Sequence, residues 1–257
     1  MKRFFICVCL FGIMSLFCVS AFASSESMNW YCAHREGHLQ PSINPSFEFI
    51  NKYDAFYIDK KHDETSKEKV IYLTFDAGYN NGNIDRILDV LKEENVTAAF
   101  FILGHLVESE TELVKRMFEN GHAVCNHTFS HAQMTQKSET EFREELCRLE
   151  EKCFELTGKN LSKYYRPPEG KFDEASLCYA QKMGYKTVFW SFAYDDWDNA
   201  KQHSCEKAKK KILDNIHNGE IMLLHPTSST NAEILGDVIR EIKKQGYRFG
   251  SLNEIEP

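Results

Sequence analysis

The sequence predicts an α/β protein with a single folded domain, a distorted (β/α)7 barrel that follows an extended N-terminal lead-in. From residue 70 onward, short runs of apolar, β-branched and aromatic residues alternate with amphipathic segments. Such alternation is typical of repeated βα units around a parallel sheet. About 230 residues remain once the first 23 are set aside, which is enough for one barrel-sized domain.

Residues 1–23 have the pattern of a secretory signal peptide. Lys2 and Arg3 give a charged start, residues 4–22 are apolar, and residues 21–23 form an A-x-A cleavage pattern. An uncleaved segment of this length that anchors the chain in the membrane is the alternative. Under both interpretations we expect the rest of the protein to be secreted across the cytoplasmic membrane and to work in the cell envelope.

Residues 24–69 are rich in Asn, Pro, Ser and charged residues, so we expect an extended segment that packs on the barrel. Residues 70–257 then form the barrel domain. Six cysteines lie beyond residue 23, and their spacing matches no small disulfide scaffold, so the sequence predicts no particular disulfide. The formal charge is −7, and the lysines and arginines are scattered. This charge distribution argues against a nucleic-acid partner.

Seven segments are expected to be strands, because they are short and rich in β-branched and aromatic residues. They are residues 70–75, 96–103, 122–126, 164–166, 186–191, 221–225 and 247–252. Seven such units suggest a barrel one unit short of the eight-fold type. An open doubly wound sheet is the alternative, since periodicity does not show whether a sheet closes.

The segments between these strands have helical patterns. Apolar residues fall on one helical face in two of them: Ile84, Ile87, Leu88 and Leu91, and Leu235, Val238, Ile239 and Ile242. The sequence Ser-Glu-Thr-Glu occurs at residues 109–112 and 138–141, and each copy predicts a capping box that opens a helix. Glycines expected at helix C-caps follow the patterns at Gly121, Gly158, Gly184, Gly219 and Gly246.

Polar and aromatic side chains follow six of the predicted strands, at the carboxyl end of each. They are Asp76, His105, His127, His131, Arg166, Asp196, Trp197 and His225. In a βα barrel this end of the strands holds the active site. We therefore expect these side chains to converge, although His105 could also cap its strand.

His127 and His131 are four residues apart. If this segment turns helically, the two imidazoles lie on one face and can share a metal ion such as zinc. Two surface histidines in a loop are the alternative. The position at a strand end, with Asp76 expected nearby, favours metal ligation.

Five stretches, taken in order, resemble the motifs of one family. They are TFDAGY, NHTFSH, RPPEG, DDW and IMLLH. The chain from about Val70 to its C-terminus resembles the polysaccharide deacetylases, the NodB homology domain of carbohydrate esterase family 4. The resemblance implies a metal-assisted hydrolase that removes N-acetyl or O-acetyl groups from a polysaccharide.

Hydrolysis of an acetamide needs an activated water molecule and an acid that protonates the leaving nitrogen. We expect Asp76 to be the base and His225 the acid. The resemblance implies that Arg166 holds the base, that Asp196 orients the acid, and that Leu223 lines the pocket for the acetyl methyl group. Further substrate contacts are expected from Trp197, Tyr79, Pro167 and His105.

Ala77 departs from the family pattern, because most members have an aspartate there that binds the metal with the two histidines. A methyl group cannot coordinate a metal ion. Two alternatives remain: a divalent cation, zinc by preference, held weakly by His127 and His131, or an oxyanion stabilised without any metal. Some members of the family that this chain resembles also lack the aspartate, so its loss does not imply inactivity.

Within the family, four stretches resemble the peptidoglycan N-acetylmuramic acid deacetylases of muramic δ-lactam synthesis in spore cortex: NKYDAFYI, FDAGYNNG, VFWSFAYDDW and LLHPTSSTNAEIL. This resemblance implies peptidoglycan glycan strands as partner, with no obligate protein partner, and the forespore intermembrane space as one location. Deacetylation of another polymer, such as chitin oligomers, acetylated xylan or peptidoglycan N-acetylglucosamine, is an alternative function. A catalytically silent glycan-binding protein is another.

Overall fold

The structure is a computed structural model that describes residues 26–255. The predicted signal peptide, residues 1–23, lies outside the described residues. Over the described part of the chain, no helix combines the length and apolar character needed to cross a membrane.

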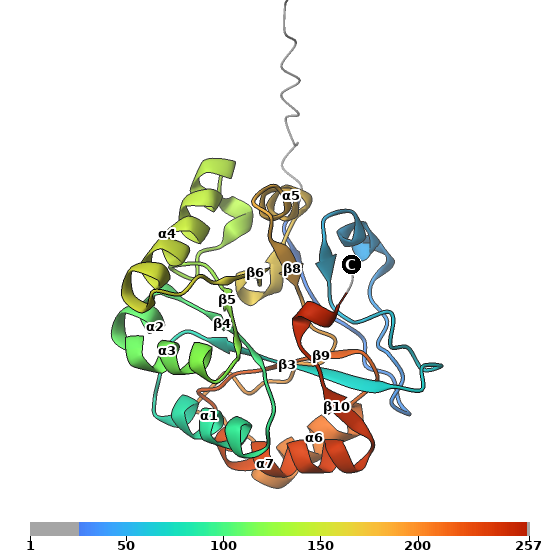
Figure 1. Cartoon of the computed structure of the whole chain (residues 1–257). Helices are drawn as coiled ribbons and strands as arrows, with labels where there is room; N and C mark the ends of the chain where they lie inside the picture. The colour runs from blue at the N-terminus through green and yellow to red at the C-terminus, as the bar shows by residue number, and fades with distance from the viewer. Residues whose placement is uncertain (1–25, 256–257) are drawn as a thin grey trace, which may run out of the picture.

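A curled, mainly parallel sheet forms the centre of the molecule (Figure 1). Its strands are β2 (Ala55–Phe56), β3 (Lys69–Ala77), β4 (Ala99–Ile102), β5 (Ala123–Asn126), β6 (Ser162–Tyr165), β8 (Lys186–Val188), β9 (Glu220–Leu224) and β10 (Tyr247–Phe249). Seven of these lie within or overlap the seven predicted segments. The strand order is β10-β3-β4-β5-β6-β8-β2, and β9 also pairs with β3.

Two isolated bridges bring the far edge of the sheet back to β9. Ile58, just after β2, bridges to Glu220, and Phe192, just after β8, bridges to Met222. Since β9 pairs with β3, the strands form a closed circuit. The predicted α/β barrel is therefore confirmed, and the open doubly wound sheet is not observed.

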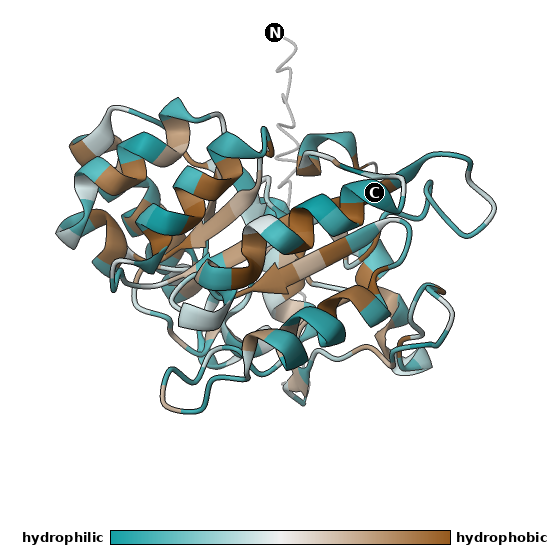
Figure 2. Cartoon of the chain, turned by 90° about the horizontal axis from the view of Figure 1, so that it is seen from below, coloured by the Kyte–Doolittle hydropathy of each residue, from teal (hydrophilic) through white to brown (hydrophobic). Residues whose placement is uncertain are grey.

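Helices cover the outside of the strands (Figure 1). The α-helices are α1 (Asn83–Glu93), α2 (Gly104–Ser109), α3 (Thr111–Glu119), α4 (Glu139–Thr157), α5 (Glu174–Lys182), α6 (Cys205–Asn215) and α7 (Ser229–Lys244). Short 3₁₀ turns lie at Pro45–Lys52, Met134–Gln136, Pro168–Gly170 and Leu252–Glu254. Figure 2 shows apolar residues along the central strands and a mixture of apolar and polar residues along the helices. This pattern is expected where each helix buries one face against the sheet.

The predicted helical faces are buried in α1 and α7. The capping box at Ser138 is present, since Ser138 accepts a hydrogen bond from the backbone of Glu141 and the Glu141 carboxylate accepts one from the backbone of Ser138. The capping box expected at Ser109 is wrong. Ser109 is the last residue of α2, and its hydroxyl donates to the carbonyl of His105. The next helix, α3, starts at Thr111 and has no side-chain cap.

The five glycines predicted after helices all have a positive φ, a backbone conformation that costs glycine little. Gly158 is the left-handed C-cap of α4. The other four lie in the turns that lead from a helix to the next strand.

The lead-in does more than pack on the barrel, because it contributes strands. β1 (Met28–Asn29) pairs with β7 (Lys171–Phe172), and β2 pairs in parallel with β8. Trp30 and Phe47 pack with Phe172 and Phe189 in an aromatic cluster under this part of the sheet. Composition gave no sign of these strands, because each is only two residues long.

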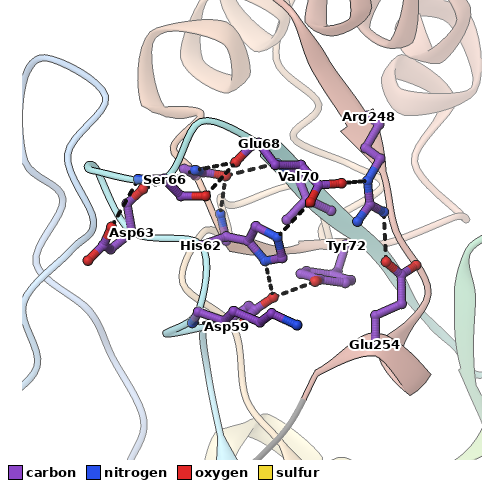
Figure 3. A network of polar contacts seen from close by, with 12 residues as sticks. Asp59, His62, Asp63, Ser66, Glu68, Val70, Tyr72, Arg248 and Glu254 are labelled. Carbon is purple, nitrogen blue, oxygen red and sulfur yellow. Dashed lines mark hydrogen bonds and ion pairs between the residues drawn. The ribbon is translucent and has the colours of Figure 1, made fainter.

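A polar network that is buried at Asp59, His62 and Tyr72 joins the end of the lead-in to the barrel, close to the amino end of β3 (Figure 3). His62 lies between two carboxylates: its Nδ1 is 2.6 Å from Asp59 Oδ2, and its Nε2 is 3.3 Å from Glu68 Oε2. The hydroxyl of Tyr72 in β3 donates to the same Asp59 oxygen at 2.5 Å. Arg248 of β10 donates to Glu68 at 2.5 Å. The network therefore joins the lead-in to the first and last strands of the barrel domain.

Candidate active site

A cavity of about 720 Å³ opens at the carboxyl ends of the strands. Its lining residues are Asp76, His127, His131, Glu169, Gly170, Trp190, Ala193, Tyr194, Asp195, Trp197, Leu223 and His225. A second hollow of about 240 Å³ shares five of them and adds Gly78, Tyr79, Leu103 and Thr227. Asp76 and His225 therefore open onto one shared cavity, as an amide hydrolase requires.

Asp76 is the penultimate residue of β3, and successive side chains of a strand point to opposite faces. Asp76 faces the cavity, whereas Ala77 is buried in the hydrophobic cluster between the sheet and its helices. Asp76 Oδ1 accepts a hydrogen bond from Arg166 Nη1 at 2.8 Å. Burial on its own would raise the pKa of Asp76, but the positive charges of Arg166 and His225 outweigh burial and lower it. Asp76 is thus held as a carboxylate at neutral pH.

Arg166 follows β6 directly and is fully buried. Its guanidinium donates to the carbonyls of Val188 and Phe189, at 3.0 and 3.3 Å, and to the hydroxyl of Thr74 at 3.0 Å. These contacts leave Nη1 pointing at Asp76. Because a buried guanidinium is always charged, it supplies a fixed positive charge behind the carboxylate.

His225 directly follows β9, and Asp196 holds it from two sides. Its Nδ1 donates to Asp196 Oδ1 at 2.7 Å, and its backbone N–H donates to Asp196 Oδ2 at 2.7 Å. Burial on its own would lower the pKa of His225, but the hydrogen bond and charge of Asp196, together with the charge of Asp76, raise it. The bond at Nδ1 leaves Nε2 as the ring nitrogen available to the cavity.

His127 and His131 lie next to each other, with ring centroids 5.1 Å apart. The segment between them does not turn helically. The segment is an irregular loop in which Thr128 and His131 both have a positive φ, of 73° and 58°. The loop folds the chain back so that the rings meet without a helix.

His127 is a neutral imidazole held in one tautomer. Its Nδ1 donates to the carbonyl of Arg166 at 2.8 Å, and burial lowers its pKa to about 4 despite the opposing charge of Asp76. Its Nε2 is therefore unprotonated, 3.6 Å from Asp76 Oδ2. An imidazole fixed in this tautomer through its second nitrogen is typical of metal sites.

His127 and His131 are suitable ligands for a divalent cation, but they form an incomplete ligand set. His127 and His131 can offer two imidazole nitrogens, and the buried methyl group of Ala77 offers nothing. Within residues 26–255 there is no cluster of three or more His, Cys, Asp or Glu side chains spaced to hold a metal ion. A cation bound by the two histidines would need water, a substrate oxygen or the Asp76 carboxylate to complete its coordination.

The residues predicted to contact substrate fall into two groups. Leu223 and Trp197 line the cavity, and Trp197 is 63% exposed at its rim. Tyr79 lines the smaller hollow, where the side chain of Asn199 donates to its hydroxyl at 2.6 Å. These three side chains are therefore available to a bound sugar.

Pro167 and His105 are not among the lining residues of either hollow. Pro167 is buried behind the surface, and the next residues of the same turn, Glu169 and Gly170, reach the cavity instead. His105 is exposed on α2, because the chain enters that helix at Gly104 and carries the imidazole away from the strand end. The structure thus does not bring these two predicted residues to the site.

Sequence reasoning missed the wall formed by Trp190, Ala193 and Tyr194. These residues follow β8 in a segment without regular structure that crosses the cavity. The lead-in supports this wall, since the indole N–H of Trp30 donates to the carbonyl of Trp190 at 2.9 Å. The only available signal was the aromatic character of VFWSFAYDDW, which is equally typical of core.

Comparisons with known proteins identify the family of the chain. A model of the polysaccharide deacetylase family matches residues 63–188. The chain is 41% identical over 232 residues to the peptidoglycan-N-acetylmuramic acid deacetylase PdaA of Bacillus subtilis, and the match covers 90% of this chain and 86% of that protein. The solved structure of B. subtilis PdaA, a family 4 carbohydrate esterase, superposes with a TM-score of 0.85 at 40% identity, over 91% of this chain and 98% of that one.

A family 4 carbohydrate esterase from Bacillus anthracis superposes with a TM-score of 0.74 at 36% identity, over 91% of this chain and 98% of that one. The motifs, the barrel and the similarity over most of each chain thus lead to one assignment. The chain belongs to the polysaccharide deacetylase family, the family 4 carbohydrate esterases, and is a hydrolase that acts on the amide C–N bond of an acetylated sugar.

Proposed function

We propose that this protein removes the N-acetyl group from N-acetylmuramic acid in peptidoglycan glycan strands, releasing acetate. The observation that carries the proposal is the pairing of Asp76 and His225 across one cavity, each held by its own partner, Arg166 and Asp196. The choice of sugar is supported by the 41% identity to B. subtilis PdaA. The free amine so produced is the group that a later step could close into a muramic δ-lactam, as in spore cortex.

The reaction needs one proton removed and one delivered. Asp76 accepts a proton from a water molecule, whose oxygen attacks the carbonyl carbon of the acetamide. His225 donates the proton on Nε2 to the nitrogen as the C–N bond breaks, which yields a free amine and acetate. Asp196 stabilises the imidazolium before transfer, and Arg166 keeps Asp76 ionised. Leu223, buried on β9 beside His225, offers an apolar surface for the acetyl methyl group.

A divalent cation, zinc by preference, would be held by His127 and His131 and bound weakly, because Ala77 supplies no third ligand. When bound, such a cation would supply positive charge for the carbonyl oxygen. Each of the proton transfers assigned above depends on side chains of this chain.

The relatives' peptidoglycan substrates favour an extracytoplasmic site of action, and the signal-like pattern of residues 1–23 supports export. Peptidoglycan glycan strands are then the partner that the enzyme meets. The forespore intermembrane space is the finer location suggested by the spore-cortex resemblance.

The test is mass spectrometry of muropeptides after peptidoglycan is treated with the wild type, with Asp76→Asn and with Asp89→Asn. Asp89 is an exposed aspartate on α1, remote from the cavity, and serves as the control. We expect loss of one acetyl group from muramic acid with the wild type and the control, and at least a hundred-fold less with Asp76→Asn. Acetate lost only from N-acetylglucosamine would reassign the sugar, and binding without turnover would favour a silent glycan-binding protein.

A further inference from the structure

We propose that Asn231, in the first turn of α7, is a positioning residue for the general acid, because it fixes Asp196 in the orientation that holds His225. The inference rests on the proposed function, in which His225 protonates the leaving amine. It also assigns a role to residues 226–235, PTSSTNAEIL, which follow His225 and whose polar residues the mechanism above does not use.

The contacts form a chain from the cavity wall to the acid. Asn231 is buried, with 1% of its surface exposed, and its Nδ2 donates to Asp196 Oδ2 at 2.6 Å and to the carbonyl of His225 at 3.2 Å. The hydroxyl of Tyr194 donates to Asn231 Oδ1. Since that oxygen is occupied as an acceptor, the amide nitrogen must face Asp196. The orientation of the Asn231 amide is thus set by hydrogen bonding.

Asp196 itself has little other support for its orientation. Its side chain is buried, with Oδ1 on His225 Nδ1 and Oδ2 shared between the His225 backbone and Asn231. Without the amide donor, Oδ2 would keep only the backbone N–H. A buried carboxylate that loses a hydrogen bond gains freedom to rotate and is less well stabilised as an anion.

The same helical turn also holds the loop that carries Asp196 and Trp197. The Ser228 hydroxyl donates to Gln202 Oε1, and Gln202 Nε2 donates to the carbonyl of Asp196 at 2.9 Å. The Thr230 hydroxyl donates to the carbonyl of His203 at 2.8 Å. The hydroxyls of Ser228 and Thr230 donate to a neutral side chain and to a backbone carbonyl. Asn231 is therefore the residue of this turn that bonds directly to the carboxylate of Asp196.

The test compares three variants. Asn231→Leu removes the amide but keeps the number and branching of the side-chain heavy atoms, and Asn231→Asp keeps its shape but replaces the donor with an acceptor. Asn218→Leu is the matched control, because Asn218 is also buried and its Nδ2 also donates two hydrogen bonds, but to the backbone carbonyls of Asp63 and Glu68 at the opposite end of the barrel.

Asn231→Leu should lower kcat about ten- to a hundred-fold with KM nearly unchanged, since the lost hydrogen bond is one to a charged group. The alkaline limb of kcat/KM should move to lower pH. Asp76 and Arg166, the other charged groups that act on His225, are unaltered in this variant, so the shift reports on Asp196. Asn231→Asp should be most impaired at high pH and should recover in part at low pH, where the introduced carboxyl is protonated and donates to Asp196.

Asn218→Leu should lower the melting temperature but keep kcat and the alkaline limb of the wild type. The proposal is overturned if Asn231→Leu, corrected for its folded fraction, has the kcat and pH profile of that control. ¹⁵N NMR titration of His225, assigned by loss of its signal in His225→Gln, separates this result from failure of the proposed function. Even without an active substrate, the pKa of His225 must be lower in Asn231→Leu than in the wild type, and an unchanged value would refute the positioning role.

Discussion

His225 and Asp196 are joined through both oxygens of the carboxylate. One oxygen accepts a hydrogen bond from the imidazole ring of His225, and the other accepts one from its backbone N–H. The backbone contact fixes where the carboxylate lies, and the ring contact fixes which nitrogen carries the proton toward the cavity. A histidine held in this way keeps its proton to a higher pH than a free histidine, because the neighbouring negative charge stabilises the imidazolium.

We predict that Asp196→Asn moves the alkaline limb of kcat/KM to lower pH. Asp196 raises the pKa of His225, so the wild-type acid loses its proton only at a pH above the ordinary histidine value. With a neutral amide in its place, His225 should deprotonate earlier, and kcat/KM near neutral pH should fall by about ten-fold or more. The measurement is acetate release between pH 5 and 10, with the exposed Asp214→Asn as control for a simple change of charge. Coincident alkaline limbs for wild type and Asp196→Asn would contradict the assignment.

We predict that Arg166→Met destabilises the protein by about 3–5 kcal/mol, because it leaves the carboxylate of Asp76 without its buried partner. Urea unfolding at pH 7 measures this loss. The double variant Arg166→Met/Asp76→Asn should recover part of it, since no buried charge then lacks compensation. Strictly additive effects of the two changes would show that the pair is not coupled.

We predict that Ala77→Asp lowers stability in metal-free solution by about 3 kcal/mol or more. The Ala77 methyl group is fully buried among apolar side chains, so an aspartate there must either bury its charge or turn toward the two histidines. If His127 and His131 form a weak metal site, added zinc should raise the melting temperature of Ala77→Asp more than that of the wild type. Ala77→Asn is the control of equal shape without charge. Equal zinc responses in all three proteins would show that a carboxylate at residue 77 adds no third ligand, and no response in any of them would argue against a metal site here.

We predict that Glu220→Gln makes stability less sensitive to rising pH. Glu220 is fully buried at the start of β9, and burial raises its pKa well above the ordinary value of 4.5. The native state therefore binds a proton that the unfolded chain releases, so this group favours folding below pH 4.5 and loses that contribution as pH rises toward its native pKa. Melting temperatures from pH 4 to 9 should fall more steeply for the wild type than for Glu220→Gln. Parallel curves would show that Glu220 does not titrate as its burial implies.

Sequence patterns were sufficient for the parts of the fold that depend on local composition. The seven strand segments and the apolar faces of α1 and α7 are visible because burial repeats with the period of each element. The convergence of Asp76, Arg166, Asp196 and His225 was also predictable, because parallel strands in a barrel end on one rim. Their roles in catalysis remain predictions that the experiments above address.

The features that the sequence did not reveal depend on contacts between distant segments. β2 is two residues long and becomes a strand only because β8 pairs with it. His105 follows its strand as the other site residues do, but an early helix start turns it outward. The rings of His127 and His131 are brought together by a loop in which Thr128 and His131 have a positive φ. The i, i+4 spacing of a helix does not predict this backbone conformation. Asn231 shows no motif of its own, and only the fold brings it to Asp196.

The pairing of β2 with β8, and the bridge from Ile58 to Glu220, have a consequence for the order of events in folding. β2 and Ile58 lie early in the chain, but their pairing partners lie in its last third. Most of the chain must therefore be translated before the barrel can close. Loop closure over such a separation is slow, and it leaves the edges of the growing sheet uncovered in the meantime. A nascent chain of this protein should therefore depend on holding factors until its last third has been made.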